Sequence, residues 1–113
     1  MHARSFLCFG IAAWTAIACG DPTHDRAVDA LGGEAPGVPE GPLHRPGQPC
    51  ATCHGESGPA DSEFTIAGTV YALLGQSQPV PNVLVRIRDF TGTERSVTTN
   101  QAGNFFVGRN PAR

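Results

Sequence analysis

The stretch Phe64-Thr65-Ile66-Ala67-Gly68-Thr69-Val70-Tyr71 decides how this chain folds. Its apolar residues recur with a period of two, which is typical of a half-buried β-strand. The alternation predicts one face made of Phe64, Ile66, Gly68 and Val70. The opposite face then carries Thr65, Ala67, Thr69 and Tyr71. A single strand is not stable alone in water, so the sequence around it must supply partners.

The sequence after this strand repeats the pattern at short intervals. A second strand is expected over residues 83–88, where an inward row alternates with an outward row, namely Val83, Val85 and Ile87 against Leu84, Arg86 and Arg88. A turn at Thr91-Gly92 leads to a third strand that contains Val97 and Thr99. A further turn over 100–104 leads to a fourth strand, Phe105-Phe106-Val107. We therefore expect a mainly β fold, with the arginines on a solvated outer face.

Three pieces of this region resemble the carboxypeptidase regulatory-like, or transthyretin-like, β-sandwich family. They are Gly68-Thr69-Val70-Tyr71, Pro79-Val80-Pro81-Asn82-Val83-Leu84-Val85-Arg86-Ile87 and Thr99-Asn100-Gln101-Ala102-Gly103-Asn104-Phe105-Phe106-Val107. Asn82 stands where the family usually has Gly, and Asn tolerates a positive φ better than most residues. Asn100 stands where the family usually has Asp. The resemblance implies an accessory or stalk module without catalytic residues.

The likeness covers residues 64–107, whereas the family's sandwich continues for further strands. We therefore expect residues 63–113 to form an incomplete transthyretin-like β-sandwich. Either its C-terminus is truncated or a partner completes the sheet. An incomplete sandwich leaves strand edges and an apolar face exposed.

The motif Cys50-Ala51-Thr52-Cys53-His54, within a segment assigned to residues 44–62, has the C-x-x-C-H pattern of covalent c-type haem attachment. Cysteines three residues apart on a helical turn lie on one side and can form thioethers with the two vinyl groups of one porphyrin. His54 then lies beneath the iron and offers an imidazole nitrogen as the proximal ligand. The motif therefore predicts a haem c held by Cys50, Cys53 and His54.

The second axial ligand of such a haem cannot be a methionine of the mature chain, because the only methionine, Met1, leaves with the predicted signal. The remaining options are His44, the less favoured His24, or a position left open or filled by a partner. A solvent-exposed role in a proline-rich loop is an equal alternative for His44. Since methionine ligation raises the reduction potential of haem iron, we expect a low-potential centre.

Other interpretations of the motif remain open. Cys50 and Cys53 could form a structural or redox disulfide, although the βαβ context of a thioredoxin-like site is missing. Zinc would need Cys50, Cys53, His54 and His44, but the adjacent Cys53 and His54 are poorly placed on one tetrahedral ion. The motif could also be vestigial or a coincidence.

Residues 1–18 are predicted to be a secretory signal. His2 and Arg4 form a weakly basic start, and Phe6 to Ala18 carries no formal charge. That stretch is shorter than the roughly 20 apolar residues of a transmembrane helix. The signal directs the chain out of the cytoplasm, where haem is attached to motifs of this kind.

Ala16-Ile17-Ala18-Cys19 resembles the lipobox of bacterial lipoproteins, with Ala where Leu is usual. The resemblance implies that Cys19 carries diacylglycerol and anchors the protein to a membrane, in the periplasm, at the outer membrane or at the cell surface. Ordinary cleavage at the same bond would instead leave Cys19 as a free or disulfide-bonded thiol.

Residues 19–43 are expected to form the lipidated N-terminus and a flexible linker. One short helix is plausible there, because Asp21 can cap it, Pro22 suits its first position, and Gly32-Gly33 would end it. A stiff, extended spacer is expected after it, because five prolines follow: Pro36, Pro39, Pro42, Pro46 and Pro49.

Composition excludes several classes of function. The net charge is −2 and no basic run is present, which argues against nucleic-acid binding. No catalytic motif is present, and Asp61 and Glu63 are interpreted as solvated acids, so we do not expect an enzyme.

Two hypotheses remain. The first is a lipid-anchored c-type haem protein with an electron-transfer or haem-bearing role, similar in arrangement to small cytochrome-c-like lipoproteins of the cell envelope and open to a redox partner protein. The second is a surface-anchored β-sandwich binding or structural lipoprotein in which the C-x-x-C-H motif forms a disulfide or is vestigial.

Overall fold

The computed structural model describes residues 20–109. The predicted signal, Cys19 and residues 110–113 lie outside this range. The described chain contains two helices, α1 (Pro22–Ala30) and α2 (Cys50–His54), and four strands, β1 (Phe64–Thr69), β2 (Leu84–Arg88), β3 (Glu94–Thr98) and β4 (Asn104–Gly108). Neither helix has the length and apolar character needed to cross a membrane.

The helix α1 begins and ends as its sequence predicts. The Asp21 carboxylate accepts hydrogen bonds from the backbone N–H groups of Thr23 (2.9 Å) and His24 (3.2 Å), which would otherwise have no helical partner. Pro22 takes the first helical position, where its missing N–H costs nothing. Gly32, with φ at +68°, stops the helix.

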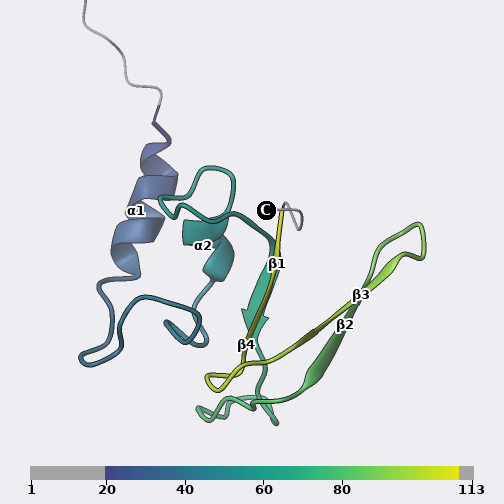
Figure 1. The fold of residues 1–113 in the computed structure, drawn as a ribbon. Coiled ribbons are helices and arrows are strands. Elements are labelled where there is room, and N and C mark those ends of the chain that lie inside the picture. The colour runs from purple at the N-terminus through teal and green to yellow at the C-terminus, as the bar shows by residue number, and fades with distance from the viewer. Residues whose placement is uncertain (1–19, 110–113) are drawn as a thin grey trace, which may run out of the picture.

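The four strands form two antiparallel ribbons, β1 with β4 and β2 with β3. The β-rich class expected from the alternating pattern is therefore confirmed at this level. Figure 1 shows the two ribbons diverging from a common junction, with both helices beside the β1–β4 ribbon and none beside the β2–β3 ribbon. The β1–β4 ribbon is thus the one that meets the C-x-x-C-H helix.

A β-bulge in β1 changes which face its first residues occupy. Phe64 pairs with Gly108 and Ile66 pairs with Val107, so the extra residue, Thr65, shifts the register. The expectation of one face shared by Phe64 and Ile66 is therefore wrong. Phe64 turns toward the helices, whereas Ile66 faces the gap between the two ribbons.

The junction between the ribbons is built around Thr99, whose side chain is only 2% exposed. Its hydroxyl donates to Val80 O (2.8 Å) and accepts from Val83 N (2.9 Å). Val80 N in turn donates to Val70 O (2.8 Å), just beyond β1. Asn82 has φ at +61°, as the substitution for Gly predicts. Thr99 therefore links β3 to the segment that joins β1 and β2.

The proline-rich segment differs from the extended spacer that its composition predicts. It folds into successive turns, closed by the bonds Val38 N to Ala35 O, His44 N to Gly41 O and Gln48 N to Arg45 O. The side chain of Asn104, in β4, then holds it against the sheet through the carbonyls of Pro42 and His44. The segment belongs to the folded part of the chain because side-chain bonds from distant residues fix it.

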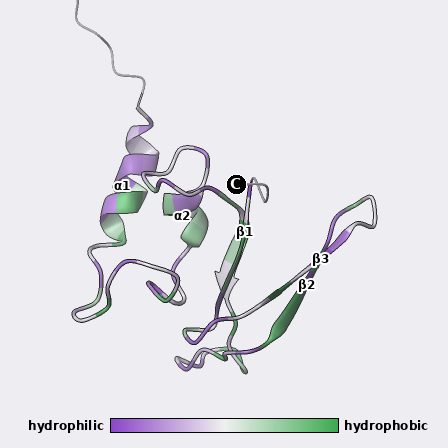
Figure 2. Cartoon of the chain, in the orientation of Figure 1, coloured by the Kyte–Doolittle hydropathy of each residue, from purple (hydrophilic) through white to green (hydrophobic). Residues whose placement is uncertain are grey.

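The described chain lacks a conventional hydrophobic core. No apolar side chain among residues 20–109 is fully buried, and the buried polar residues are Thr99 and Asn104. The hydrophobic colour in Figure 2 is spread over α2, β1 and β2 rather than gathered in one interior. Hydrogen bonds at the junction therefore carry an unusual share of the stabilisation.

The hydroxyl of Thr99 can be removed without changing the shape of its side chain by Thr99→Val. We expect this variant to lose about 1–3 kcal/mol of unfolding free energy, because Val83 N and Val80 O lose their partner. Urea unfolding measures the loss. Thr98→Val, at the exposed neighbouring position, is the matched control and should unfold as the wild type does. Equal stability of the two variants would contradict the role given to Thr99.

Candidate functional site

The helix α2 presents the C-x-x-C-H motif as the sequence predicts. Cys50 and Cys53 lie one helical turn apart, and both are half-buried, free thiols that line the same pocket. Burial raises the pKa of the Cys50 thiol, and the neighbouring Cys53 acts in the same direction. Cys50 therefore stays protonated at neutral pH, which slows its exchange into a disulfide.

This short helix is held in place from two sides. His24, on α1, contacts Thr52 O through Nε2 at 2.8 Å. Ala60 N donates to Cys53 O at 3.0 Å, which closes the loop after the helix. A five-residue helix depends on such contacts. His24, the less favoured candidate ligand, is thus engaged in positioning α2.

The ring of His54 is fixed by its neighbours. Its Nδ1 lies 2.8 Å from Ser62 O and 3.1 Å from the Ser62 hydroxyl. Because a backbone carbonyl can only accept, Nδ1 carries the proton and Nε2 keeps its lone pair. The ring also stacks on Phe64 at 4.2 Å between centroids, and Phe64 stacks on Phe106 at 4.8 Å. The bulge that turns Phe64 toward the helices therefore supports His54.

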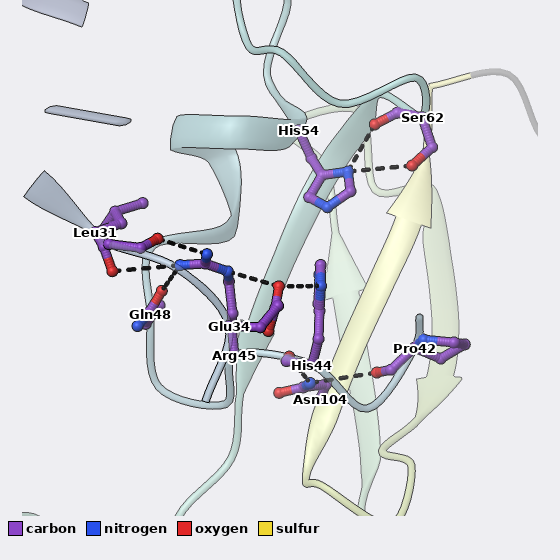
Figure 3. Close-up of polar contacts among 10 residues, drawn as sticks. Leu31, Glu34, Pro42, His44, Arg45, Gln48, His54, Ser62 and Asn104 are labelled. Carbon is purple, nitrogen blue, oxygen red and sulfur yellow. Dashed lines mark hydrogen bonds and ion pairs between the residues drawn. The ribbon is translucent and has the colours of Figure 1, made fainter. Parts of the chain in front are cut away.

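His44 lies opposite His54, and the two ring centroids are 5.8 Å apart. Figure 3 shows the rings approaching each other from two different elements, the turn-rich loop and α2. Asn104 sets the position of His44, since its Nδ2 donates to His44 O at 2.9 Å and its Oδ1 accepts from the Thr69 hydroxyl at 2.7 Å. The structure thus brings together the two histidines proposed as iron ligands.

A carboxylate and a guanidinium lie behind His44. Glu34 Oε1 is 3.1 Å from His44 Nδ1 and accepts a 2.8 Å hydrogen bond from Arg45 Nε. The His44 contact is at ion-pair distance but off the direction of a regular hydrogen bond. The hydrogen bond from Arg45 lowers the pKa of Glu34 below its ordinary value, and His44 acts in the same direction. Glu34 therefore stays ionised at neutral pH.

Both histidines face a pocket of about 730 Å³, which falls in the size range of sites for small molecules and cofactors. The lining is mostly apolar. The apolar and thiol side chains that line the pocket include Leu31, Cys50, Cys53, Phe64, Phe105 and Phe106. A flat apolar group with a metal at its centre would meet thiols on one edge and imidazoles on its faces.

The donors fit a covalently attached haem better than a bare metal ion. Imidazole nitrogens bind metals at about 2 Å, so two rings on opposite sides of one ion have centroids about 6 Å apart. The 5.8 Å separation is close to that value. Over residues 20–109, no three His, Cys, Asp or Glu side chains gather closely enough to hold a metal ion. The four-ligand zinc site is therefore not assembled, whereas a porphyrin brings four nitrogens of its own.

The structure adds residues that the motif did not reveal. Ser62, Glu34, Arg45 and Asn104 orient the histidines, yet none has a fixed spacing from the C-x-x-C-H motif that would have marked it. Glu63, interpreted as a solvated acid, pairs with Arg109 at 3.0 Å. Arg86, Arg88 and Arg95 are exposed, as expected of a solvated outer face. Cys19 lies outside the described residues.

Comparisons with protein families, with curated proteins and with solved structures find no significant match to this chain.

Because Glu34 is ionised in the folded protein, the free energy of unfolding should fall as the pH becomes acidic. Its folded-state pKa lies below the ordinary value of 4.5, so its contribution is fully present above that pH and is lost as the pH falls through the folded-state pKa. Denaturant unfolding between pH 6 and the acid limit of solubility measures this loss in the wild type. Glu34→Gln should lack this part of the pH dependence. An unchanged acid profile in that variant would contradict the contact.

Proposed function

We propose that this protein is an exported, lipid-anchored c-type haem protein with an electron-transfer or haem-bearing role in the bacterial cell envelope. One observation carries the proposal. A C-x-x-C-H helix directs two thiols and one imidazole into an apolar pocket, and a second imidazole faces the first at 5.8 Å. This combination of donors is what a covalently bound haem requires from a protein.

Four residues would hold the cofactor: Cys50 and Cys53 would bind the porphyrin through thioethers, and His54 and His44 would offer imidazole nitrogens to the iron. Ser62 O keeps the proton on His54 Nδ1 and so leaves Nε2 available. Phe64 stacks on the His54 ring, and Phe106 stacks on Phe64, so that the orientation of the imidazole is fixed. Haem iron, when bound, supplies one-electron exchange between its ferric and ferrous forms.

The ligand pair sets the expected redox behaviour. Two imidazoles without a methionine favour a low reduction potential. The anionic Glu34 beside His44 favours the more positively charged ferric iron, and so acts in the same direction. A low-potential centre suits an electron donor rather than an oxidant, and a redox partner protein is part of the proposal.

The remaining parts of the chain have supporting roles. Diacylglycerol on Cys19 would hold the protein to a membrane facing the periplasm or the cell surface. The two ribbons are proposed to be part of an incomplete transthyretin-like β-sandwich, and the exposure of Ile66 (40%), which faces the gap between the ribbons, supports an unfinished apolar layer. That module would serve for docking rather than for chemistry.

Covalent haem is tested by expressing the full chain with the haem-attachment machinery of the periplasm. The wild-type protein should show haem staining after denaturation in SDS. The double variant C50S/C53S should lose all staining, because no thiol remains to form a thioether. Ala51→Ser places the same new side chain at an exposed position of the motif and should keep the stain.

The outcome also separates the two functional hypotheses. An unstained wild-type protein would leave only the β-sandwich binding or structural lipoprotein.

The lipid anchor is tested in the same cells. The stained band of the wild-type protein should sediment with membranes, and Cys19→Ala should release it into the soluble fraction.

The second axial ligand is tested by His44→Ala. We expect the ferric haem to change from low spin to high spin, because one strong-field imidazole is removed. His24→Gln is the matched control, since it removes the imidazole while its amide can still donate to Thr52 O, and it should stay low spin. His44→Met should keep low spin and raise the reduction potential. A low-spin spectrum of His44→Ala would rule out His44 as the ligand.

A further inference from the structure

Glu34 has a position that its pairing with Arg45 does not explain. The carboxylate lies four residues after the end of α1 and contacts His44 Nδ1 at 3.1 Å. Ser62 provides the corresponding contact for His54, but there the acceptor is a neutral carbonyl. Nδ1 of one imidazole therefore lies beside a charged carboxylate at ion-pair distance, and Nδ1 of the other beside a neutral carbonyl at hydrogen-bond distance.

The geometry of the carboxylate is costly for a purely structural ion pair. A planar guanidinium can bind both oxygens of a carboxylate at once. Here Oε1 receives Arg45 Nε and lies 3.1 Å from His44 Nδ1, whereas Oε2 and that same Nδ1 are both buried without a regular hydrogen bond among residues 20–109. A charged oxygen without a partner loses its hydration and gains nothing in return. The arrangement directs the charge at His44 at the expense of the pairing with Arg45.

Arg45 is fixed independently of this contact. Its Nη2 donates to Gly32 O at 2.6 Å, and its Nη1 donates to Gln48 Oε1 at 2.9 Å and to Leu31 O at 3.3 Å. These bonds join the end of α1 to the loop that carries His44. Arg45 thus provides a rigid support that holds Glu34 Oε1 beside the imidazole.

We infer that Glu34 is a positioning residue for the second axial ligand: its charged carboxylate lies 3.1 Å from His44 Nδ1, so its field favours the tautomer with the proton on that nitrogen and leaves Nε2 as the donor toward the iron. The inference rests on the proposed function and specifies how one of its ligands is controlled. Carboxylate support of a metal-bound histidine is a general means of raising ligand basicity. A more basic imidazole and a negative charge beside it both favour the ferric iron, so Glu34 would lower the reduction potential.

The test compares haem-loaded wild type, Glu34→Gln and Glu34→Asp. We expect E34Q to keep covalent haem but to shift the reduction potential upward, because the amide carries no charge. Its low-spin EPR signal should also change, since that signal reports the strength and orientation of the axial imidazoles. E34D keeps the charge but is one methylene shorter, so its shift should have the same sign and be smaller. If E34Q does not accumulate, the reduction potential and EPR signal of E34D decide the test.

Glu56→Gln is the matched control. Glu56 is an exposed carboxylate just after α2 that contacts Arg109 and neither histidine, so removal of its charge should leave potential and EPR signal unchanged. Wild-type values in both Glu34 variants would overturn the inference while leaving the proposed function intact. An equal shift in E56Q would overturn it as well, because the effect would then come from net charge. A wild-type protein without SDS-resistant haem would overturn the proposed function itself.

Discussion

The side chain of Asn104 joins the sheet to the loop that carries His44, and the arrangement of the site depends on it. Its amide donates to the carbonyls of Pro42 and His44 and accepts from the hydroxyl of Thr69, while the residue itself is only 7% exposed. One buried group therefore spans β4, β1 and the proline-rich turns. Two neighbouring bonds support the same connection, because Asn100 Nδ2 also donates to Pro42 O and Gly47 N donates to the Thr69 hydroxyl.

This dependence on polar contacts follows from the missing core. A chain of this size usually gains most of its stability by burying apolar side chains, yet none is fully buried in the described part. Several apolar side chains, among them Phe64, Phe105 and Phe106, instead line the pocket beside Cys50, Cys53 and the two histidines. A haem in that pocket would act as the missing interior, so that loading the cofactor and completing the fold would be one process.

The sequence predicts the local structure well and the distant contacts poorly. Period-two alternation locates the first three strands, and the turn over 100–104 locates the fourth. Asp21 and Pro22 place the start of α1, and Asn82 takes the positive φ expected of it. The bulge at Thr65 is not predicted, because an alternating sequence fits the regular register and the bulged register equally well. Local sequence also fails to predict the path of the proline-rich segment and the contact of Glu34 with His44. Both depend on partners 10 to 60 residues away, such as Asn104. The motif identifies Cys50, Cys53 and His54, but not the residues that orient the ligands.

We propose that His44 and His54 bind one iron from opposite sides. A crystal structure of the haem-loaded protein, with anomalous diffraction recorded at the iron edge, would locate that iron. We expect a single anomalous peak between the two rings, bonded to Nε2 of each, in a porphyrin joined to Cys50 and Cys53. An iron peak away from His44, or no iron in protein matured with the attachment machinery, would contradict it.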